Sequence, residues 1–281
     1  MNKTKKYDAS SIEVLEGLEP VRRRPGMYIG GTDNSSMHHL FSEVIDNAMD
    51  EAVANFASFI EVKVEKDNII TVYDNGRGIP IDPHPSFPDK SALEVIMTTL
   101  HAGGKFSNKV YQTSGGLHGV GISVVNALSE FVDVEIYRDK KIYNQKFSKG
   151  HPTSKLKELK KKTNRKGTKV SFKPDPEIFG LDNYFNCKKL YDFSKSKAYL
   201  FAGVEIRWFC EGEISKKENI PENDVFKFSN GLIDLVENEV DEKMSLLTDI
   251  FSGNRERDKN NLSFEWAINW SLGNNSFLNS Y

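Results

Sequence analysis

The stretch EVIDNAMDEA, residues 43–52, is typical of a helix that has an apolar face and an acidic face. A helical wheel places these apolar side chains together on one side: Phe41, Ile45, Ala48 and Ala52. The other side carries Glu43, Asn47 and Asp50 without a basic residue one turn away. Taken alone, this pattern favours a helix that packs on a core and turns its acidic side to water. The repulsion between like charges, and asparagine's poor helix propensity, favour the alternative of a cation or basic ligand group over this face.

The composition limits the class of protein. A chain of 281 residues is long enough for one or two domains. Its net charge of −2 provides no overall attraction to nucleic acid or to a membrane. Two cysteines, Cys187 and Cys210, do not make a disulfide framework, which is typical of the reducing cytoplasm. We find neither a signal peptide nor a run of about 18 apolar residues, so we expect a cytoplasmic protein that does not enter the membrane.

The alternation of apolar and polar residues predicts strands around this helix. Residues 59–74 are expected to form two strands joined near Asp67 and Asn68. The other expected elements are strands at 131–150 and 167–175, helices at 38–55, 91–102, 119–130 and 188–203, a short helix within 10–19 that breaks at Pro20, and a proline-rich loop at 80–88. Together they predict an α+β fold with a mostly antiparallel sheet.

Two later segments stand out by their polarity. Residues 155–169, KLKELKKKTNRKGTK, are strongly basic and are expected to form a solvated hairpin or loop, with a contact to a phosphate backbone as the alternative. A polar stretch that ends at Pro221 indicates a domain boundary. Beyond it we expect a helix at 231–242, a charged loop at 252–261 and a strand at 262–272, which are too few residues to bury a core of their own.

A second motif, DNGRGIP, occupies residues 74–80 directly after an expected strand. Asp74 would stand at the end of that strand, where its carboxylate can accept hydrogen bonds from a ligand. Gly76 and Gly78 allow a close approach of the backbone or a positive φ. A plain surface turn explains the motif equally well, because Asp, Asn and Gly are common turn residues.

A third motif, SGGLHGVGISVVNALSE at 114–130, is a glycine-rich loop that opens a helix. Unpaired N–H groups at such a helix start, together with the helix dipole, bind phosphate. Four glycines at 115, 116, 119 and 121 favour phosphate binding over an ordinary loop. Neither a P-loop nor a Rossmann fingerprint occurs in the sequence.

Together the three motifs predict a magnesium-dependent nucleotide hydrolase. Asn47 can ligate Mg²⁺, which prefers oxygen ligands and substrate phosphates. Glu43 can orient and deprotonate an attacking water. Lys105 lies close to the glycine loop in the sequence, and phosphoryl transfer requires chiefly positioning and neutralisation of charge.

In order and spacing, the patterns E-x-x-x-N-x-x-D, D-x-G-x-G-I-P and G-G-L-H-G-V-G resemble the nucleotide-binding boxes of the GHKL ATPase superfamily. The strings VRRRPGMYIG, LHAGGKFSNKVYQTSGGLHGVGISVVNALS and GTKVSF look like the ATPase subunit of bacterial type IIA DNA topoisomerases. Within that family, FSNKVYQ and DPHPSFPDKSALEVIMTTLHAGGKF resemble the topoisomerase IV branch more than the gyrase branch. The likeness covers essentially the whole chain and weakens after about residue 180.

The resemblance implies roles for the matching residues. Glu43 would be the general base, Asn47 would ligate Mg²⁺, and Asp74 would accept a hydrogen bond from the adenine amino group of ATP. Thr168 would join Asp74 through a water, and Tyr7, like Ile12, would belong to an arm that reaches the partner's pocket. The nucleotide contacts implied in this way are Tyr7, Asn47, Asp50, Asp74, Arg77, Gly78, Ile79, Pro80, Lys105, Tyr111, Gly116, Leu117, His118, Gly119, Val120, Gly121, Arg138 and Thr168. His118 has the alternative of an ordinary side chain at a helix start.

The resemblance also implies an architecture. The fold would be a GHKL (Bergerat) ATPase sandwich with helices on one face of the sheet, with an N-terminal arm at 1–15, the ATPase domain at 16–221 and the start of an α/β transducer domain at 222–281. The partners would be a second copy in an ATP-gated homodimer, an A-type topoisomerase subunit and double-stranded DNA. The family's γ-phosphate lysine would lie beyond FLNSY, so we expect nucleotide binding with impaired hydrolysis and dimer closure.

Two other interpretations stay open at this point. A histidine kinase domain would share the superfamily boxes, but it needs no water-activating base, and the RRRPGMYIG loop argues against it. A nucleotide-binding module without turnover is the second alternative, and ATPase measurements with and without the complete second domain would separate it from an enzyme.

Overall fold

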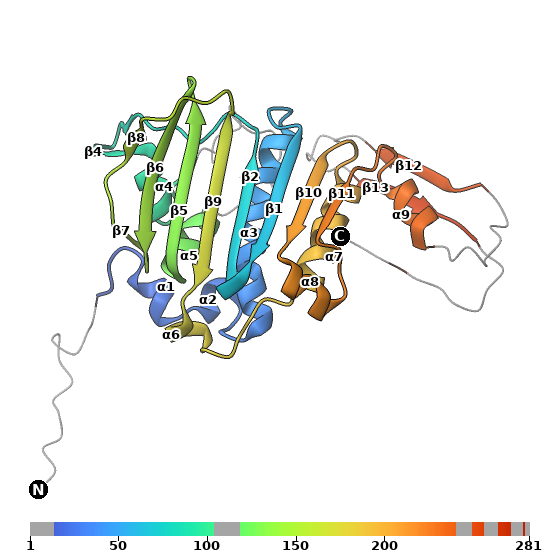
Figure 1. The fold of residues 1–281 in the computed structure, drawn as a ribbon, viewed down its shortest axis with the longest axis horizontal. Helices are drawn as coiled ribbons and strands as arrows, with labels where there is room; N and C mark the ends of the chain where they lie inside the picture. Colours follow the sequence, from blue (N-terminus) through green and yellow to red (C-terminus); the bar gives the residue numbers. More distant parts are fainter. Residues whose placement is uncertain (1–13, 104–118, 240–248, 256–263, 271–277, 279–281) are drawn as a thin grey trace, which may run out of the picture.

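A nine-stranded sheet with helices over one face makes up most of the described chain (Figure 1). The computed structural model describes residues 14–103, 119–239, 249–255, 264–270 and 278. The strands of this sheet are β1 (Phe59–Glu65), β2 (Ile69–Asp74), β5 (Ser129–Arg138), β6 (Lys141–Ser148), β7 (His151–Pro152), β8 (Lys157–Leu159), β9 (Gly167–Pro174), β10 (Glu205–Cys210) and β11 (Asn223–Phe226).

The strand order is β11-β10-β1-β2-β9-β5-β6-β7, and β8 pairs with β6. Only the pairing of β1 with β10 is parallel among the described strands of this sheet. The predicted α+β fold with a mostly antiparallel sheet and helices on one face is therefore confirmed.

The helices are α1 (Glu19–Arg23), α2 (Gly26–Ile29), α3 (Asn34–Val53), α4 (Ala92–Thr98), α5 (Gly121–Ala127), α6 (Pro176–Phe179), α7 (Cys187–Leu200), α8 (Gly212–Glu218) and α9 (Leu232–Glu239). Two separate hairpins complete the described chain: β3 (Pro83–His84) with β4 (Phe87–Ser91), and β12 (Phe251–Arg255) with β13 (Phe264–Ile268). Among the described residues, no helix combines the length and the apolar composition that crossing a membrane requires.

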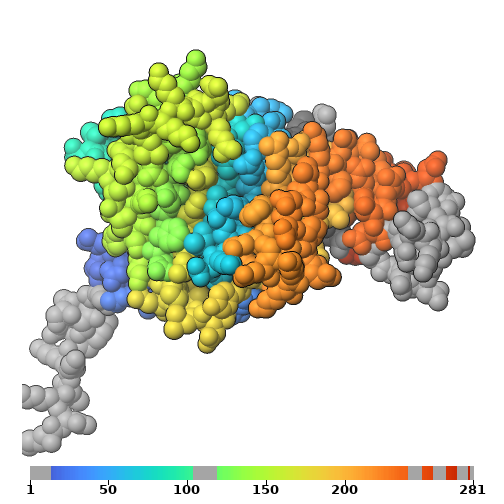
Figure 2. Space-filling view, in the orientation of Figure 1, coloured from blue at the N-terminus to red at the C-terminus, as the bar shows by residue number. Residues whose placement is uncertain are grey.

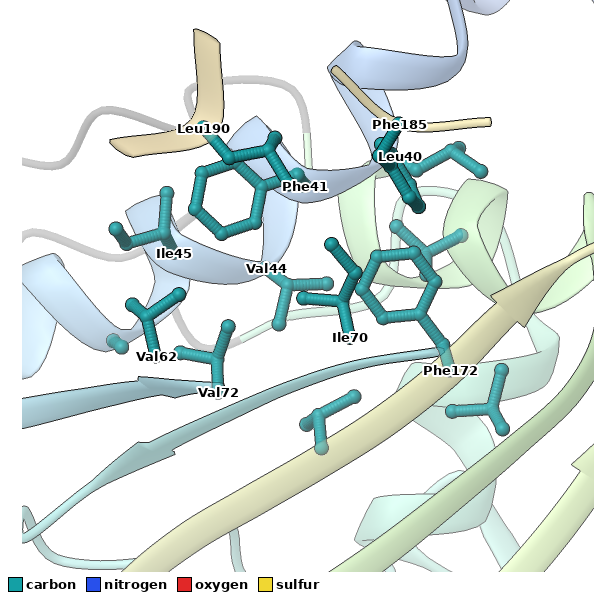
Figure 3. Packing of buried hydrophobic residues seen from close by; sticks show 14 of the residues in the cluster. Leu40, Phe41, Val44, Ile45, Val62, Ile70, Val72, Phe172, Phe185 and Leu190 are labelled. Atoms are coloured by element: carbon teal, nitrogen blue, oxygen red, sulfur yellow. The ribbon is translucent and has the colours of Figure 1, made fainter. Parts of the chain in front are cut away.

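Helix α3 supplies the centre of the core. It begins at Asn34, earlier than predicted, because the side chain of Asp33 accepts a 2.7 Å hydrogen bond from the Ser36 N–H and caps the helix. Its apolar face packs on the sheet, as Figure 3 shows for these labelled residues: Leu40, Phe41, Val44 and Ile45 against Val62, Ile70, Val72 and Phe172. Each such burial contributes about 1.5–3 kcal/mol to folding.

The predicted hairpin at 59–74 is confirmed as β1 and β2, joined by the short 3₁₀ turn Lys66–Asn68. Asp67 and Asn68 have φ values of 59° and 66°, which Asp and Asn tolerate better than most side chains. The alternating burial of β1 places every second side chain on the core. Strand β2 ends at Asp74, as the sequence predicts.

Three expectations about the edges of the fold were wrong. Pro20 does not break a helix but lies in the first turn of α1, where a missing N–H costs no hydrogen bond, and residues 14–16 are not helical. The proline-rich loop contains the β3–β4 hairpin, since prolines fit short strands that need few ladder donors. Residues 252–255 of the predicted charged loop belong instead to β12, because β13 is available to pair with them, and residues 256–261 lie outside the described residues.

The expected boundary at Pro221 falls just before β11. This strand pairs with β10, so Asn223–Phe226 extends the same sheet that contains β1 and β2. The next helix, α9, contacts α7 and β13. The β12–β13 hairpin is a separate two-stranded sheet.

Candidate functional site

Asp74 ends β2 in the middle of the sheet. Its neighbours in register are Ile60 on β1 and Thr168 on β9, and only 6% of the residue is exposed. Its Oδ1 accepts a 2.8 Å hydrogen bond from the Gly76 N–H. Burial, with a smaller contribution from the charge of Glu51, raises the pKa of Asp74 to about 7, although the backbone hydrogen bonds of Gly76 and Thr168 lower it. A buried carboxylate at a strand end, as predicted, is therefore present and titrates near neutral pH.

The backbone around Asp74 is packed so closely that side chains would not fit at the glycine positions. A Cβ on Gly76 would lie 2.7 Å from Asp74 Oδ1 and 2.7 Å from Glu51 Oε2. Gly78 has a φ of +76°. A Cβ on Gly167, at the start of β9, would lie 1.9 Å from the carbonyl oxygen of Asp74. Gly76, Gly78 and Gly167 thus allow the end of α3, the turn after β2 and the start of β9 to meet around Asp74.

Glu51, at the end of α3, holds this turn, and the sequence did not single it out. Its Oε2 accepts hydrogen bonds from the backbone N–H of Arg77 at 2.9 Å and from Arg77 Nε at 3.1 Å, while Oε1 accepts from Nη2 at 2.7 Å. The Arg77 guanidinium also lies 3.7 Å from the centre of the Phe56 ring. Another carboxylate of the same helix, Asp46, points elsewhere, and its Oδ1 is 2.7 Å from Lys197 Nζ of α7.

We expect Glu51→Ala to loosen the turn that carries Gly76, Arg77 and Gly78. The substitution leaves the Arg77 N–H without its acceptor, which costs about 1–3 kcal/mol of unfolding free energy. Hydrogen exchange of the amides at 76–79 should accelerate, and urea unfolding should report the loss of stability. Asp46→Asn is the matched control on the same helix and should leave exchange at 76–79 unchanged. Equal exchange in the Glu51 variant and the wild type would show that this carboxylate does not hold the turn.

Three more of the predicted residues, Arg138, Ile79 and Thr168, make hydrogen bonds in the turn after Asp74. Arg138 Nη1 donates to the carbonyl of Gly78 at 3.1 Å, and the Ile79 N–H donates to Thr168 Oγ1 at 3.1 Å. Ile79 packs partly against the core, whereas Pro80 is exposed. The structure therefore brings Arg77, Gly78, Ile79, Arg138 and Thr168 around Asp74.

The acidic side of α3 faces the start of α5. Glu43 and Asn47 are half-buried and Asp50 is buried. A Cβ on Gly121, the first residue of α5, would lie 1.8 Å from Glu43 Oε2, so the carboxylate lies directly against this helix start. Asn47 Nδ2 donates to the carbonyl of Glu43 at 2.8 Å, which orients the amide. The first and third motifs therefore meet in space.

The described end of the glycine loop has the geometry expected of a loop that opens a helix. Gly119 has a φ of 60°, and Val120 precedes α5 without a side-chain cap. The remaining predicted contacts lie outside the described residues: Tyr7, Lys105, Tyr111, Gly116, Leu117 and His118, together with Ile12. Within the described ranges, no group of three or more His, Cys, Asp and Glu side chains is placed to hold a metal ion.

Comparisons with known proteins agree with this geometry. A family model described as "Histidine kinase-, DNA gyrase B-, and HSP90-like ATPase" matches residues 32–178. The chain is 55% identical over 276 residues to the B subunit of DNA topoisomerase 4 from Rickettsia felis, covering 98% of this chain and 41% of that protein. It is 56% identical over 276 residues to the same protein from Bartonella bacilliformis, covering 98% and 40%.

Gyrase B proteins are also similar to this chain. The B subunit of DNA gyrase from Synechocystis is 45% identical over 269 residues, covering 96% of this chain and 24% of that protein. The crystal structure of the 43K ATPase domain of Thermus thermophilus gyrase B, in complex with an aminocoumarin, superimposes with a TM-score of 0.71 at 38% identity, covering 85% of this chain and 60% of that chain. The chain thus spans about two fifths of the length of the topoisomerase 4 relatives.

Proposed function

The chain belongs to the family of histidine kinase-, DNA gyrase B- and HSP90-like ATPases, and we propose that it is the ATP-binding and ATP-hydrolysing part of a type IIA DNA topoisomerase. Among these enzymes, topoisomerase IV is favoured over gyrase by identities of 55–56% to its B subunit against 45% to a gyrase B. The observation that carries the proposal is the meeting of three motifs around Asp74 and Glu43. Strand β2, the end of α3 and the start of β9 converge on Asp74, and Glu43 lies against α5.

Adenine recognition is assigned to Asp74. Its buried carboxylate can accept the amino group of adenine, and the turn at 76–79 would line the base. Glu51 of α3 and Arg138 of β5 hold this turn by hydrogen bonds to Arg77 and Gly78, and Thr168 holds it through the Ile79 N–H. The half-exposed residues at 119–121 would lie along the phosphates.

Hydrolysis is assigned to Glu43. Its carboxylate would orient the attacking water and accept its proton, and its position against the start of α5 places it beside the proposed phosphate site. The orientation of the Asn47 amide by the Glu43 carbonyl suits a side-chain oxygen ligand for Mg²⁺. Mg²⁺ fits this site because it is commonly held by one or two protein oxygens and substrate phosphates, and when bound it neutralises the charge of the transferred phosphoryl group.

Within the complete protein, we propose that this chain works in the cytoplasm as part of an ATP-gated homodimer. An A-type subunit and double-stranded DNA would be its further partners. Residues 1–15 would form the dimer arm, and the division into an ATPase domain and a transducer domain would follow β11, since that strand completes the sheet. Closure of the dimer on ATP would then be coupled to the passage of one DNA duplex through another.

Calorimetric titration with ATP and GTP tests the proposed site. Guanine presents an oxygen acceptor where adenine presents its amino donor. We expect GTP to bind about 5- to 150-fold more weakly than ATP, because facing Asp74 with an acceptor leaves buried groups unpaired at a cost of about 1–3 kcal/mol. Equal affinities would move base recognition away from Asp74, and absence of ATP binding would overturn the proposed function.

A further inference from the structure

Two basic segments, residues 139–141 and 155–166, lie side by side at the end of the sheet where β2 stops. Strand β8 pairs with β6, bringing Lys157 opposite Asn144, and the Thr163 N–H donates to the carbonyl of Lys140 at 3.1 Å. The basic edge is defined by the exposed cations of these two segments: Lys140, Lys141, Lys155, Lys157, Lys160, Lys161, Lys162, Arg165 and Lys166. The same two segments, 139–141 and 155–166, contain nine basic residues and only two acidic ones, Asp139 and Glu158.

The positive charge of this edge is largely uncompensated. Lys141 Nζ lies 2.9 Å from Glu158 Oε2, and no other cation of the basic edge makes an ion pair with a described carboxylate. The whole chain carries a net charge of −2, so the excess is local. In Figure 2 the yellow-green atoms of this part of the chain form the upper left of the visible face and are open to solvent. A surface of this kind attracts polyanions.

The backbone that carries these lysines is held in place. Besides the bond from Thr163 to Lys140, the Arg165 N–H donates to Thr163 Oγ1 at 3.0 Å, and Tyr73 Oη donates to the carbonyl of Lys166 at 2.8 Å. The Arg165 guanidinium lies 5.2 Å from the centre of the Tyr73 ring. These bonds fix the backbone at residues 163, 165 and 166, which lowers the entropy cost of binding there.

We propose that the basic edge contacts the phosphate backbone of double-stranded DNA. Duplex DNA presents about one charge per 1.7 Å of its axis, so one duplex offers phosphates to several of the nine cations at once. Lysine acts as a point charge without the planar fork of arginine, so the contact is with phosphates and does not read sequence. The choice of duplex DNA over other polyanions rests on the proposed function, whereas the positive surface itself does not.

Salt-dependent DNA binding by the 281-residue chain tests this contact. The test variant replaces Lys160, Lys161 and Lys162 by glutamine. The matched control replaces three exposed lysines of α7 and α8, Lys189, Lys216 and Lys217, by glutamine, so that both variants lose the same charge. Fluorescence anisotropy of a short labelled duplex gives the dissociation constant over a range of salt concentrations.

For the test variant, we expect the slope of log K against log[salt] to fall by about 0.9 for each phosphate that is no longer neutralised, and binding at about 0.1 M salt to weaken at least tenfold. The control should stay within about twofold of the wild type. Lys140→Gln, on the neighbouring turn, should lower the slope by about 0.9 on its own. This second variant keeps the test valid if the triple variant does not fold.

The possible outcomes separate this inference from the proposed function. Equal weakening in the test and control variants would mean that only total charge matters, and the basic edge would not be a site. Polyglutamate that displaces the duplex at equal charge concentration would assign the surface to an acidic protein instead of DNA. ATP titration of the same samples is independent: intact ATP binding with unchanged DNA binding contradicts the basic edge alone, whereas absence of ATP binding in the wild type contradicts the proposed function.

Discussion

Glu43→Ala is expected to leave ATP bound and to slow its hydrolysis by about 10²–10⁴-fold, the usual contribution of a general base. The reason is geometric. The Glu43 carboxylate lies against the start of α5 and away from the turn that would hold the base, so its removal takes away the proton acceptor without dismantling the adenine site. Calorimetry measures ATP binding, and single-turnover assays measure the hydrolytic step even when it is slow.

Two companion variants sharpen the test of Glu43. Glu43→Gln keeps the size of the side chain beside Gly121 and should lose hydrolysis to the same extent, since only the proton acceptor is removed. Asp46→Asn removes another carboxylate of α3, which pairs with Lys197 of α7, and should keep the wild-type rate. A glutamine variant that hydrolyses ATP at the wild-type rate would remove Glu43 from the mechanism.

Asp74→Asn is expected to weaken ATP binding by about 1–3 kcal/mol, because the amide leaves a buried hydrogen bond to adenine unmade or mismatched. The substitution conserves shape, and an amide oxygen can still accept the hydrogen bond from the Gly76 N–H. Loss of affinity would therefore report the contact with the base and not a collapse of the turn. Calorimetry at constant pH gives the comparison, and unchanged affinity would place the adenine site elsewhere.

The same substitution should stabilise the protein without nucleotide at high pH. The pKa of Asp74 is raised from 3.8 to about 7 by burial, so the folded state keeps a proton that the unfolded chain releases. Its stabilising effect is fully present below about pH 4 and is lost as pH rises through 7, a change on the order of 4 kcal/mol at 1.36 kcal/mol per unit. Asparagine does not titrate and escapes this loss.

Urea unfolding at pH 5 and pH 8 measures this second effect. The stability of Asp74→Asn relative to the wild type should increase between the two values, with the largest advantage at pH 8. A difference that stays constant across this range would mean that Asp74 does not carry the raised pKa. If both expected results are found, weaker ATP binding and higher stability at pH 8, Asp74 lowers the stability of the nucleotide-free protein and contributes to nucleotide recognition.

Local patterns predicted the elements that organise the core. The 3.6-residue period found α3, and the period of two found β1, β2, β5, β6 and β9, because each burial pattern is repeated within its own segment. The prediction was wrong for Pro20, the β3–β4 hairpin and β12. The effect of Pro20 depends on its position in the first turn of a helix. The β3–β4 hairpin and β12 depend on strands that pair with them, which local composition does not specify.

The candidate site divides in the same way. Asp74 with its two glycines, and Glu43 with Asn47, were identified from motif chemistry, and the structure brings them together with their expected neighbours. The role of Glu51 could not be predicted, because a helical wheel gives the direction of a side chain but not the residue that it contacts. Its partner, Arg77, is supplied by a loop from another part of the chain.

The sequence by itself determined helix α3, the strands β1, β2, β5, β6 and β9, and which residue types could bind a nucleotide, since these follow from local spacing and side-chain chemistry. Only the tertiary structure decided that Glu51 clamps Arg77, that burial raises the pKa of Asp74 to about 7, and that Lys140 lies beside the 157–166 segment. These properties arise from contacts between residues far apart in the chain. Hydrogen bonding, desolvation and summed charge depend on distance in space, which sequence spacing does not encode.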